Sequence, residues 1–490
     1  MPDQPRARGA AEVAATAARG AGLKRELRLG DLVLTQVMFI VGAQWVGTAA
    51  MLGHEQIVYW LLAMALFYLP QAAVVIFLNR QMPLEGGLYQ WTRIGFNDGM
   101  GFLVAWNLWV FALILLASYG VVIADTFGYV LGPSAHWLTG TKWYDGAVTG
   151  FMVAMIILVS LYGLRIGKWL HDAGGTAHLL TFAALLIMPI FAFAHHTVVD
   201  HRPFAVALPR ANLLSVNIFS KLALGALTGF EYVAILAGET RNPGKAIGRS
   251  VLIATPVIAL MFILGTSAVL AATPAGKIDL IAPIPQALTY GLRSFGWAIY
   301  IVPVLTMLLL MRHIGNVNLL FAANTRLPMV AGWDGLLPGW FTRLHPRYRT
   351  PLNSILFVGA VTLVFAVLSL VGVGLQEAFQ LLDNAAGVLY AFCYLAMFAL
   401  PVVGMRAFER APLWLRLAAI SGFAVTLLYI VLSVFPIIEV KSWGSFAAKI
   451  IVVVVGANLL GAALYRAEKR RQAEREAGMA GLPQPPSTKS

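Results

Sequence analysis

Apolar residues occur along this chain in long runs of about 20, separated by short polar segments. A helix of this length crosses the roughly 30 Å hydrocarbon core of a membrane and satisfies its own backbone hydrogen bonds there. About twelve such runs recur, so we expect an all-α integral membrane protein of about 12 transmembrane helices. The predicted spans are residues 31–53, 58–78, 99–131, 146–164, 175–194, 213–238, 250–272, 296–323, 352–372, 379–403, 413–436 and 446–465.

Two of the predicted spans contain residues that interrupt a membrane helix. The first span includes VGAQWVGTAAMLG, from Val41 to Gly53, and the sixth includes Gly225, Gly229 and Glu231. Non-helical backbone is tolerated at membrane depth only where it faces protein or a water-filled cavity, because lipid cannot satisfy its N–H and C=O groups. Both interruptions therefore predict a binding site inside the protein.

The composition favours a membrane protein over a soluble or nucleic-acid-binding one. The 490 residues are 59% hydrophobic and 12% charged, whereas an average soluble chain is roughly 25% charged. The formal charge of +13 resides mainly in loops on one side of the predicted bundle, which follows the positive-inside rule and argues against a nucleic-acid surface. We therefore expect a multi-pass protein of the cytoplasmic (inner) membrane with both termini in the cytoplasm. The inner side is assigned Arg80, Arg93, Arg165, Arg249, Arg343 and Arg406 among others, and the outer side is assigned Lys142, Arg202, Arg210, Lys277 and Lys441.

Several motifs match one family of membrane carriers. In the sixth span, Gly229, Phe230 and Glu231 precede the turn GETRNPGKAI at residues 238–247. The segment between the second and third spans contains Pro83, Gly86, Gly87, Tyr89, Gly101, Phe102 and Trp106. On these motifs the chain resembles the amino acid, polyamine and organocation permease superfamily.

The resemblance implies a fold of the leucine-transporter type, in which two inverted repeats of five helices each begin with a broken helix. The broken helices are then the first and sixth spans. The implied units are a basic cytoplasmic tail at 1–29, a core at 30–403 with repeats at 31–194 and 213–403, two peripheral helices at 404–465, and a charged, proline-rich cytoplasmic tail at 466–490. The two peripheral helices suit the outside of the bundle or a homodimer interface.

The ends of a broken helix suit the two charges of an amino acid, because free N–H groups attract a carboxylate and free C=O groups attract an ammonium. The resemblance implies a Gly-Ser/Thr-Gly pattern at the first break, where this chain has Gly47, Thr48 and Ala49, so alanine replaces the third glycine. At the sixth-span break we expect carbonyl groups from Ala226 to Phe230 to bind the amine, with the Phe230 ring closing over the ligand. The predicted substrate-binding residues are Gly42, Gln44, Trp45, Gly47, Thr48, Ala49, Asn107, Ala226, Gly229, Phe230, Glu231 and Tyr232.

Two titratable residues in the spans are candidates for proton coupling. His178 stands where many relatives have a lysine whose ammonium occupies the place of a sodium ion, and histidine titrates near neutral pH. We expect His178 either to carry a coupling proton or to be a neutral residue bonded to a backbone carbonyl. Glu231 has three interpretations, since it can bind a cationic side chain, carry a proton, or hold the two half-helices together. Arg312 lies deep in the eighth span and needs a carboxylate, carbonyl groups or water, so Glu231 and Asp383 are its candidate partners.

These features predict a secondary active transporter, not an enzyme, that moves an amino acid by alternating access and is driven by proton symport or by exchange with a counter-substrate. A polyamine or amine carrier is the alternative within transport, although the spans offer few carboxylates for it. A transport-incompetent nutrient sensor is the alternative from another class. We expect no cofactor and no metal site, because the loop with His195, His196, Asp200 and His201 lacks the spacing of a zinc site. The expected partners are a small-molecule substrate and the lipid bilayer.

Overall fold

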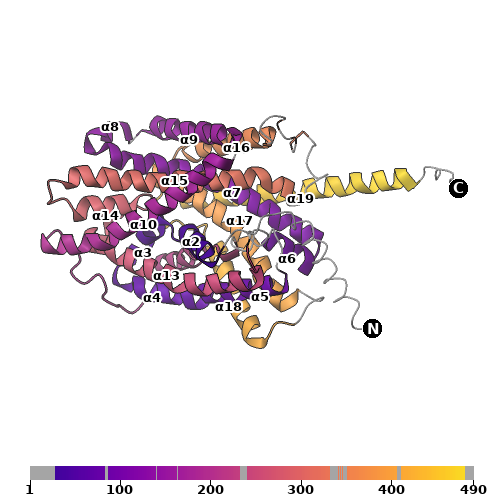
Figure 1. The fold of residues 1–490 in the computed structure, drawn as a ribbon, viewed down its shortest axis with the longest axis horizontal. Helices are drawn as coiled ribbons and strands as arrows, with labels where there is room; N and C mark the ends of the chain where they lie inside the picture. Colours follow the sequence, from indigo (N-terminus) through magenta and orange to yellow (C-terminus); the bar gives the residue numbers. More distant parts are fainter. Residues whose placement is uncertain are drawn as a thin grey trace.

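The computed structural model describes residues 28–82, 87–139, 141–162, 164–231, 240–330, 340–341, 343, 345, 350–404 and 410–480. The regular elements of these residues are helices, which confirms the predicted all-α class. Ten of the helical stretches are long and apolar enough to cross a membrane, and a bent pair of shorter helices makes up to eleven. Figure 1 shows them as a bundle of long helices that run in the same general direction.

The helices follow the predicted spans closely. The first half contains α2 (Leu29–Ile40), α3 (Ala43–Ala50), α4 (Gln56–Ala63), the π-helical turn η2 (Met64–Tyr68), α5 (Leu69–Gln81), α6 (Leu88–Gly95), α7 (Asp98–Leu131), α8 (His136–Thr139), α9 (Lys142–Tyr162) and α10 (Leu164–Ala194). The second half contains α11 (Leu213–Ser220), the π-helical turn η4 (Lys221–Ala226), α13 (Pro243–Ala272), α14 (Pro283–Gly291), α15 (Ala298–Val330), α16 (Leu352–Ser369), α17 (Leu375–Val403), α18 (Leu413–Leu432) and α19 (Trp443–Ala480).

The first span is bent where the sequence contains its interruption. Helix α2 ends at Ile40, α3 begins at Ala43, and the two axes differ by 49°. The sixth span is a short apolar helix, Leu213–Ala226, followed by Gly229 with a backbone φ of 129° that an L side chain rarely adopts. Residues 232–239, in the second half of this span, lie outside the described part of the chain. The total of twelve spans and the inverted repeat therefore stay predictions.

Helices from the two halves of the sequence pack against each other to form the centre of the bundle. Helix α7 packs against α15 and α17, α10 packs against α15, and α2 packs against α13. Helix α18 packs against α5 and α17, while α19 contacts α7 and α17 and exposes a row of large apolar side chains that includes Val452 and Leu459. At 38 residues, α19 is longer than the roughly 20 residues that a membrane span requires, and Figure 1 shows it extending beyond the bundle.

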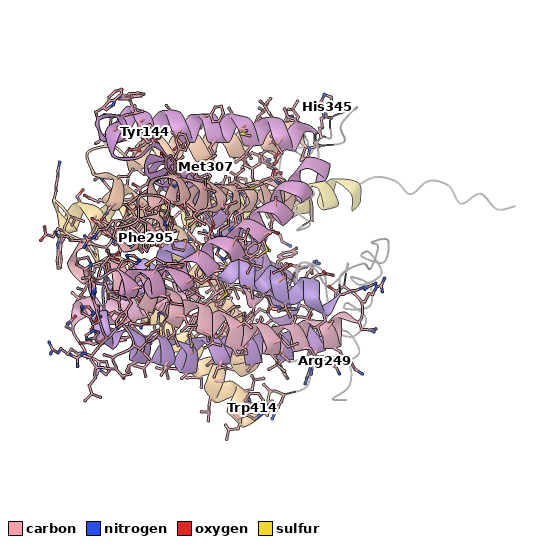
Figure 2. All side chains as sticks on the ribbon, turned by 60° about the vertical axis from the view of Figure 1, so that its left-hand side comes forward. Tyr144, Arg249, Phe295, Met307, His345 and Trp414 are labelled. Carbon is pink, nitrogen blue, oxygen red and sulfur yellow. The ribbon has the colours of Figure 1, made fainter. Side chains whose placement is uncertain are left out.

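The two ends of the bundle carry different segments. Figure 2 places Arg249 and His345 toward one end, and Tyr144 and Phe295 toward the other. The sequence assigns the segments of the first pair to the inner side and those of the second pair to the outer side. Helix α14 lies in the connection between α13 and α15, between two predicted spans; it is short and begins with Pro283, a favoured residue at the first position of a helix.

Candidate functional site

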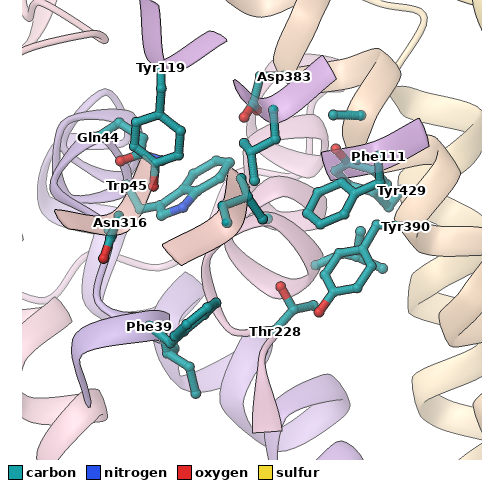
Figure 3. Close-up of a pocket in the computed structure, with 18 of the residues that line it drawn as sticks. Phe39, Gln44, Trp45, Phe111, Tyr119, Thr228, Asn316, Asp383, Tyr390 and Tyr429 are labelled. Carbon is teal, nitrogen blue, oxygen red and sulfur yellow. The ribbon is translucent and has the colours of Figure 1, made fainter. Parts of the chain in front are cut away.

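A cavity of about 120 Å³ lies in the centre of the bundle, beside the bend between α2 and α3. Its volume limits the occupant to a small solute. Five parts of the chain surround it, namely the first-span bend, α7, the sixth span, α15 and α17, with Tyr429 added from α18 (Figure 3). The lining residues are Phe39, Ile40, Gly42, Gln44, Trp45, Phe111, Leu115, Tyr119, Leu224, Gly225, Thr228, Arg312, Asn316, Leu320, Asp383, Ala386, Gly387, Tyr390 and Tyr429.

The bend of the first span presents the start of α3 to this cavity. Gly42 is the N-cap of α3, and as a glycine it has no side chain that could cap the first N–H groups of the helix. The first N–H groups of a helix have no partner within the helix, so they attract an anion. A Cβ atom at Gly42 would lie 2.6 Å from Cδ1 of Trp45, which explains why glycine occupies this position. Gly42, Gln44 and Trp45, three of the predicted binding residues, do line the cavity.

Arg312 of α15 brings a buried positive charge to the same bend. Its side chain is 3% exposed, and its Nη2 atom donates a 2.9 Å hydrogen bond to the carbonyl oxygen of Val41. Among the residues that the structure describes, its Nε and Nη1 atoms have no hydrogen-bond partner. A guanidinium is always charged and carries five N–H donors, and burying it with unused donors is costly. The free donors of Arg312 therefore make the cavity a suitable place for a carboxylate.

Asp383 of α17 adds the opposite charge to the cavity lining. Figure 3 shows Gln44, Trp45 and Tyr119 on one side of the cavity and Asp383 with Tyr429 on the other. A carboxylate accepts hydrogen bonds only, so Asp383 suits an ammonium group. The cavity lining thus contains one carboxylate, from Asp383, and one guanidinium, from Arg312, among largely apolar and aromatic side chains.

The sixth span contributes residues from its first half and from the interruption itself. Leu224, Gly225 and Thr228 line the cavity, whereas Ala226 is buried away from it. A Cβ atom at Gly225 would overlap the six-membered ring of Trp45, so the indole packs directly on this glycine. The close approach of Trp45 requires the absence of a side chain at this position.

Glu231 lies behind the cavity wall in a network of hydroxyl and amide groups. Its carboxylate, 2% exposed, accepts hydrogen bonds from the hydroxyls of Tyr390 and Tyr394 and a longer one, 3.4 Å, from Nε2 of Gln71. The Tyr394 hydroxyl also accepts from Nε2 of Gln71 at 2.6 Å and from the backbone N–H of Gly229 at 3.1 Å. These contacts tie Glu231 to α5 and α17. The third interpretation of Glu231, that it joins the two half-helices, stays a prediction, because residues 232–239 lie outside the described part of the chain.

Other predicted residues of the first and sixth spans lie outside the cavity lining. Gly47 packs on Pro283 of α14, with an added Cβ only 2.6 Å from the Pro283 side chain. Thr48 donates to the carbonyl oxygen of Gln44 at 3.2 Å, and Ala49 is fully buried. The ring of Phe230 is buried and stacks on Tyr68 with a centroid distance of 4.8 Å. These residues shape the packing around the bend.

One further predicted binding residue, Asn107, is not among the residues that line the central cavity. Asn107 of α7 points toward α19, where its Nδ2 donates to Oδ1 of Asn458 at 2.9 Å. It lines a separate, mainly apolar cavity between α7, α17 and α19. Tyr232 lies outside the described residues.

His178 of α10 is close to Arg312 without lining the cavity. It is 0% exposed, and its ring meets the ring of Phe182 edge-on at 4.9 Å. Neither ring nitrogen has a hydrogen-bond partner in the described part of the chain. One turn earlier, a Cβ added to Gly174 would lie 3.3 Å from Cα of Arg312, so α10 and α15 approach closely here. His178 is near enough to Arg312 and His313 for their charges to interact.

Lys221, a buried lysine in η4, is not among the binding or coupling residues predicted from the sequence. Its side chain is 2% exposed, Nζ donates to Oδ1 of Asn384, and Nζ lies 5.8 Å from the ring centroid of Tyr429. The signal was present in the sequence, because a lysine within the apolar sixth span is rare unless it has a function.

The histidine-rich loop after α10 makes a different contact from a metal site. An Oδ2–Nε2 contact of 2.7 Å joins Asp200 of this loop to His54, which follows α3. Among the residues that the structure describes, no group of three or more His, Cys, Asp or Glu side chains is placed to hold a metal ion.

Comparison with known proteins gives a family and several relatives. A family model described as Amino acid permease matches residues 32–456. A branched-chain amino acid permease of Bacillus subtilis is 23% identical over 397 residues, covering 75% of this chain and 81% of the relative. An aspartate/glutamate permease of Lactococcus lactis is 24% identical over 84% of this chain and 88% of its own length. A probable agmatine/putrescine antiporter of Lactococcus lactis is 24% identical over 71% and 72%.

Proposed function

We propose that this chain, which belongs to the amino acid permease family, binds a zwitterionic amino acid in its central cavity and carries it across the membrane by alternating access. The family and the relatives make it a membrane transporter of small solutes. The proposal adds the binding mode, the drive and the direction of insertion.

The observation that carries the proposal is the pairing of Arg312 and Asp383 in one small cavity. The substrate carboxylate would take the free Nε and Nη1 donors of Arg312, together with the uncapped N–H groups at the start of α3. The substrate amine would take Asp383, while the Phe111, Trp45 and Tyr390 rings surround the rest of the molecule. A zwitterion has one charge for each group, so its binding leaves no buried charge without a partner.

Alternating access would exploit the bent first span. The hydrogen bond from Arg312 of α15 to Val41 connects α15 to the end of α2. A ligand that accepts hydrogen bonds from the other nitrogen atoms of Arg312 would therefore also affect the position of the helices around the bend. His178 would carry the coupling proton in symport. Its ring nitrogens have no hydrogen-bond partner among the described residues, and the ring lies where α10 packs against α15, next to Arg312. Exchange with a counter-substrate is the other drive, and the antiporter among the relatives supports it.

The orientation belongs to the proposal as well. Basic residues concentrate in the segments assigned to the cytoplasm, and Arg249 and His345 of these segments lie toward one end of the bundle (Figure 2). We propose insertion in the cytoplasmic membrane with both termini on the cytoplasmic side, and α19 offers its exposed apolar face to lipid or to a second copy.

Uptake into proteoliposomes tests the proposal. The panel holds the 20 labelled amino acids with putrescine and agmatine, with and without an inward proton gradient, and with or without unlabelled solute inside. We expect uptake of at least one amino acid, either stimulated by the gradient or dependent on preloading. Binding without any flux would instead favour a nutrient sensor, and flux of diamines alone would favour an amine carrier.

A further inference from the structure

We propose that Lys221 is a selectivity residue: a fixed positive charge at the amine end of the cavity that admits zwitterionic and acidic amino acids and rejects diamines. This inference rests on the proposed function, because it assigns the substrate class of the same cavity. It concerns a residue that lies behind the lining rather than in it.

The position of Lys221 follows from three contacts. Its Nζ donates to Oδ1 of Asn384, the residue that directly follows Asp383 on α17. Nζ also lies 5.8 Å from the ring centroid of Tyr429, which lines the cavity. One turn further along the sixth span, Leu224 and Gly225 line the cavity too. Lys221 therefore stands directly behind the part of the wall that carries Asp383.

The contacts leave the Asp383 carboxylate available to a ligand. Lys221 donates a hydrogen bond to the Asn384 amide oxygen. Asn384 is held in place by a 2.8 Å hydrogen bond from its Nδ2 to the carbonyl oxygen of Ser433. Asp383 itself faces the cavity (Figure 3). The lysine thus acts on Asp383 through its charge, and the two charges are close enough to interact.

A structural role alone does not account for a charged residue here. An ammonium at membrane depth is costly, and a neutral donor would serve the Asn384 amide oxygen equally well. A buried lysine at membrane depth is a functional candidate on these grounds.

The charges around the cavity determine which substrates Lys221 would favour or exclude. Arg312 and Lys221 provide two positive charges, Asp383 provides one negative charge, and Glu231 is held by Tyr390, Tyr394 and Gln71 away from the lining. A zwitterion adds no net charge to this set. A diamine adds two positive charges and meets a single carboxylate, which already interacts with Lys221, so like-charge repulsion opposes its entry.

The test compares Lys221→Met and Lys221→Gln with Lys221→Arg, each purified in detergent. The measurement is the thermal stabilisation produced by each of the 20 amino acids, by putrescine and by agmatine, because a ligand that binds the folded state raises its unfolding midpoint. Wild type and Lys221→Arg are expected to respond to amino acids and to ignore diamines. Both uncharged variants should bind a diamine at least about tenfold more tightly than wild type does, since removing a like charge relieves repulsion of this order.

Two further variants separate charge from structure. Asn384→Leu removes the acceptor of Lys221 but keeps the lysine, and it should still reject diamines. Adding Asp383→Asn to Lys221→Met should abolish the newly gained diamine binding, because the attracting carboxylate is then gone.

The outcomes distinguish this inference from the proposed function. Amino acid binding by wild type, with uncharged Lys221 variants that bind amino acids and reject diamines as wild type does, would overturn the role of Lys221 and leave the proposed function standing. Diamine binding by wild type as tight as its amino acid binding would also overturn it. A folded wild type that responds to no amino acid would overturn both.

Discussion

Arg312 and Val41 are 271 residues apart in the sequence and are joined by a 2.9 Å hydrogen bond from Nη2 to the carbonyl oxygen at the end of α2. The carbonyl groups in the last turn of a helix carry partial negative charge and have no partner within the helix. A guanidinium at this place stabilises the bend of the first span and leaves two nitrogen donors free beside the cavity. The contact links a structural feature, the broken span, to the binding of a substrate carboxylate.

Replacing Arg312 should therefore weaken substrate binding. We expect Arg312→Met to lower amino acid affinity by about 10- to 100-fold, since a hydrogen bond to a charged group contributes roughly 1.5–3 kcal/mol. Arg312→Lys should recover only part of this, because an ammonium lacks the planar fork that serves the carbonyl and the ligand together. Radioligand binding measures both. Arg293→Gln, at an exposed site, is the matched control, and wild-type affinity in Arg312→Met would refute the carboxylate role.

Asp383 should recognise the amino group of the substrate. We expect Asp383→Asn to reduce affinity for the transported amino acid by about tenfold or more, and to reduce affinity for its des-amino analogue much less. Competition binding with the two compounds measures the difference. Glu377→Gln, on the same helix but outside the cavity lining, serves as control. Equal losses for both compounds would mean that Asp383 stabilises the cavity rather than the amine.

The Tyr394 hydroxyl should stabilise the interrupted sixth span. Tyr394→Phe removes the acceptor of the buried Gly229 N–H and one donor to Glu231. Leaving a buried N–H unpaired costs about 1–3 kcal/mol. We expect a lower unfolding midpoint in detergent together with slower transport. Tyr300→Phe, on the lipid-facing side of α15 with 76% exposure, should change neither. An unchanged midpoint in Tyr394→Phe would argue against the network.

Gly225 should be replaceable only together with Trp45. A methyl group at Gly225 overlaps the indole, so Gly225→Ala should displace the ring and reduce substrate binding by about tenfold or more, as core overpacking costs roughly 1–3 kcal/mol. Combining it with Trp45→Leu should restore part of the binding relative to Gly225→Ala, and a double-mutant cycle measures this coupling. Gly146→Ala on α9, where nothing lies within 4 Å of the added Cβ, is the control. Additive effects would exclude the steric explanation.

His178 should be needed for proton coupling if the symport drive is correct. The unpartnered ring nitrogens make His178 able to take up a proton in a step where solvent or a carboxylate reaches it. We expect His178→Gln to bind substrate but to lose stimulation of uptake by an inward proton gradient. The exposed His201→Gln should keep it. A full response to the gradient in His178→Gln would remove His178 from the coupling mechanism and favour exchange.

Several features of the site could be predicted because they depend on local sequence. The interruption at Gly42 could be predicted from a glycine within an apolar run, and the neighbouring Gln44 and Trp45, which were predicted with it, line the central cavity. Lys221 could equally have been predicted as a functional residue from its charge within an apolar span, but it was not. Asn107 was selected as a polar residue in a span, but periodicity alone does not tell which neighbour a polar face meets, and its partner is Asn458.

The sequence by itself determined the all-α class, the long apolar helices, the place where the first span bends, and the family that the motifs resemble, because apolar run length and helix-breaking residues act within a few turns of the chain. The tertiary structure decided which charges share a site. Arg312 meets Val41, Lys221 meets Asn384 beside Asp383, and Glu231 meets Tyr390 and Tyr394 across sequence separations of 159 to 271 residues. Such pairs depend on how helices from the two halves pack and rotate, and a single sequence carries no local signal for that geometry.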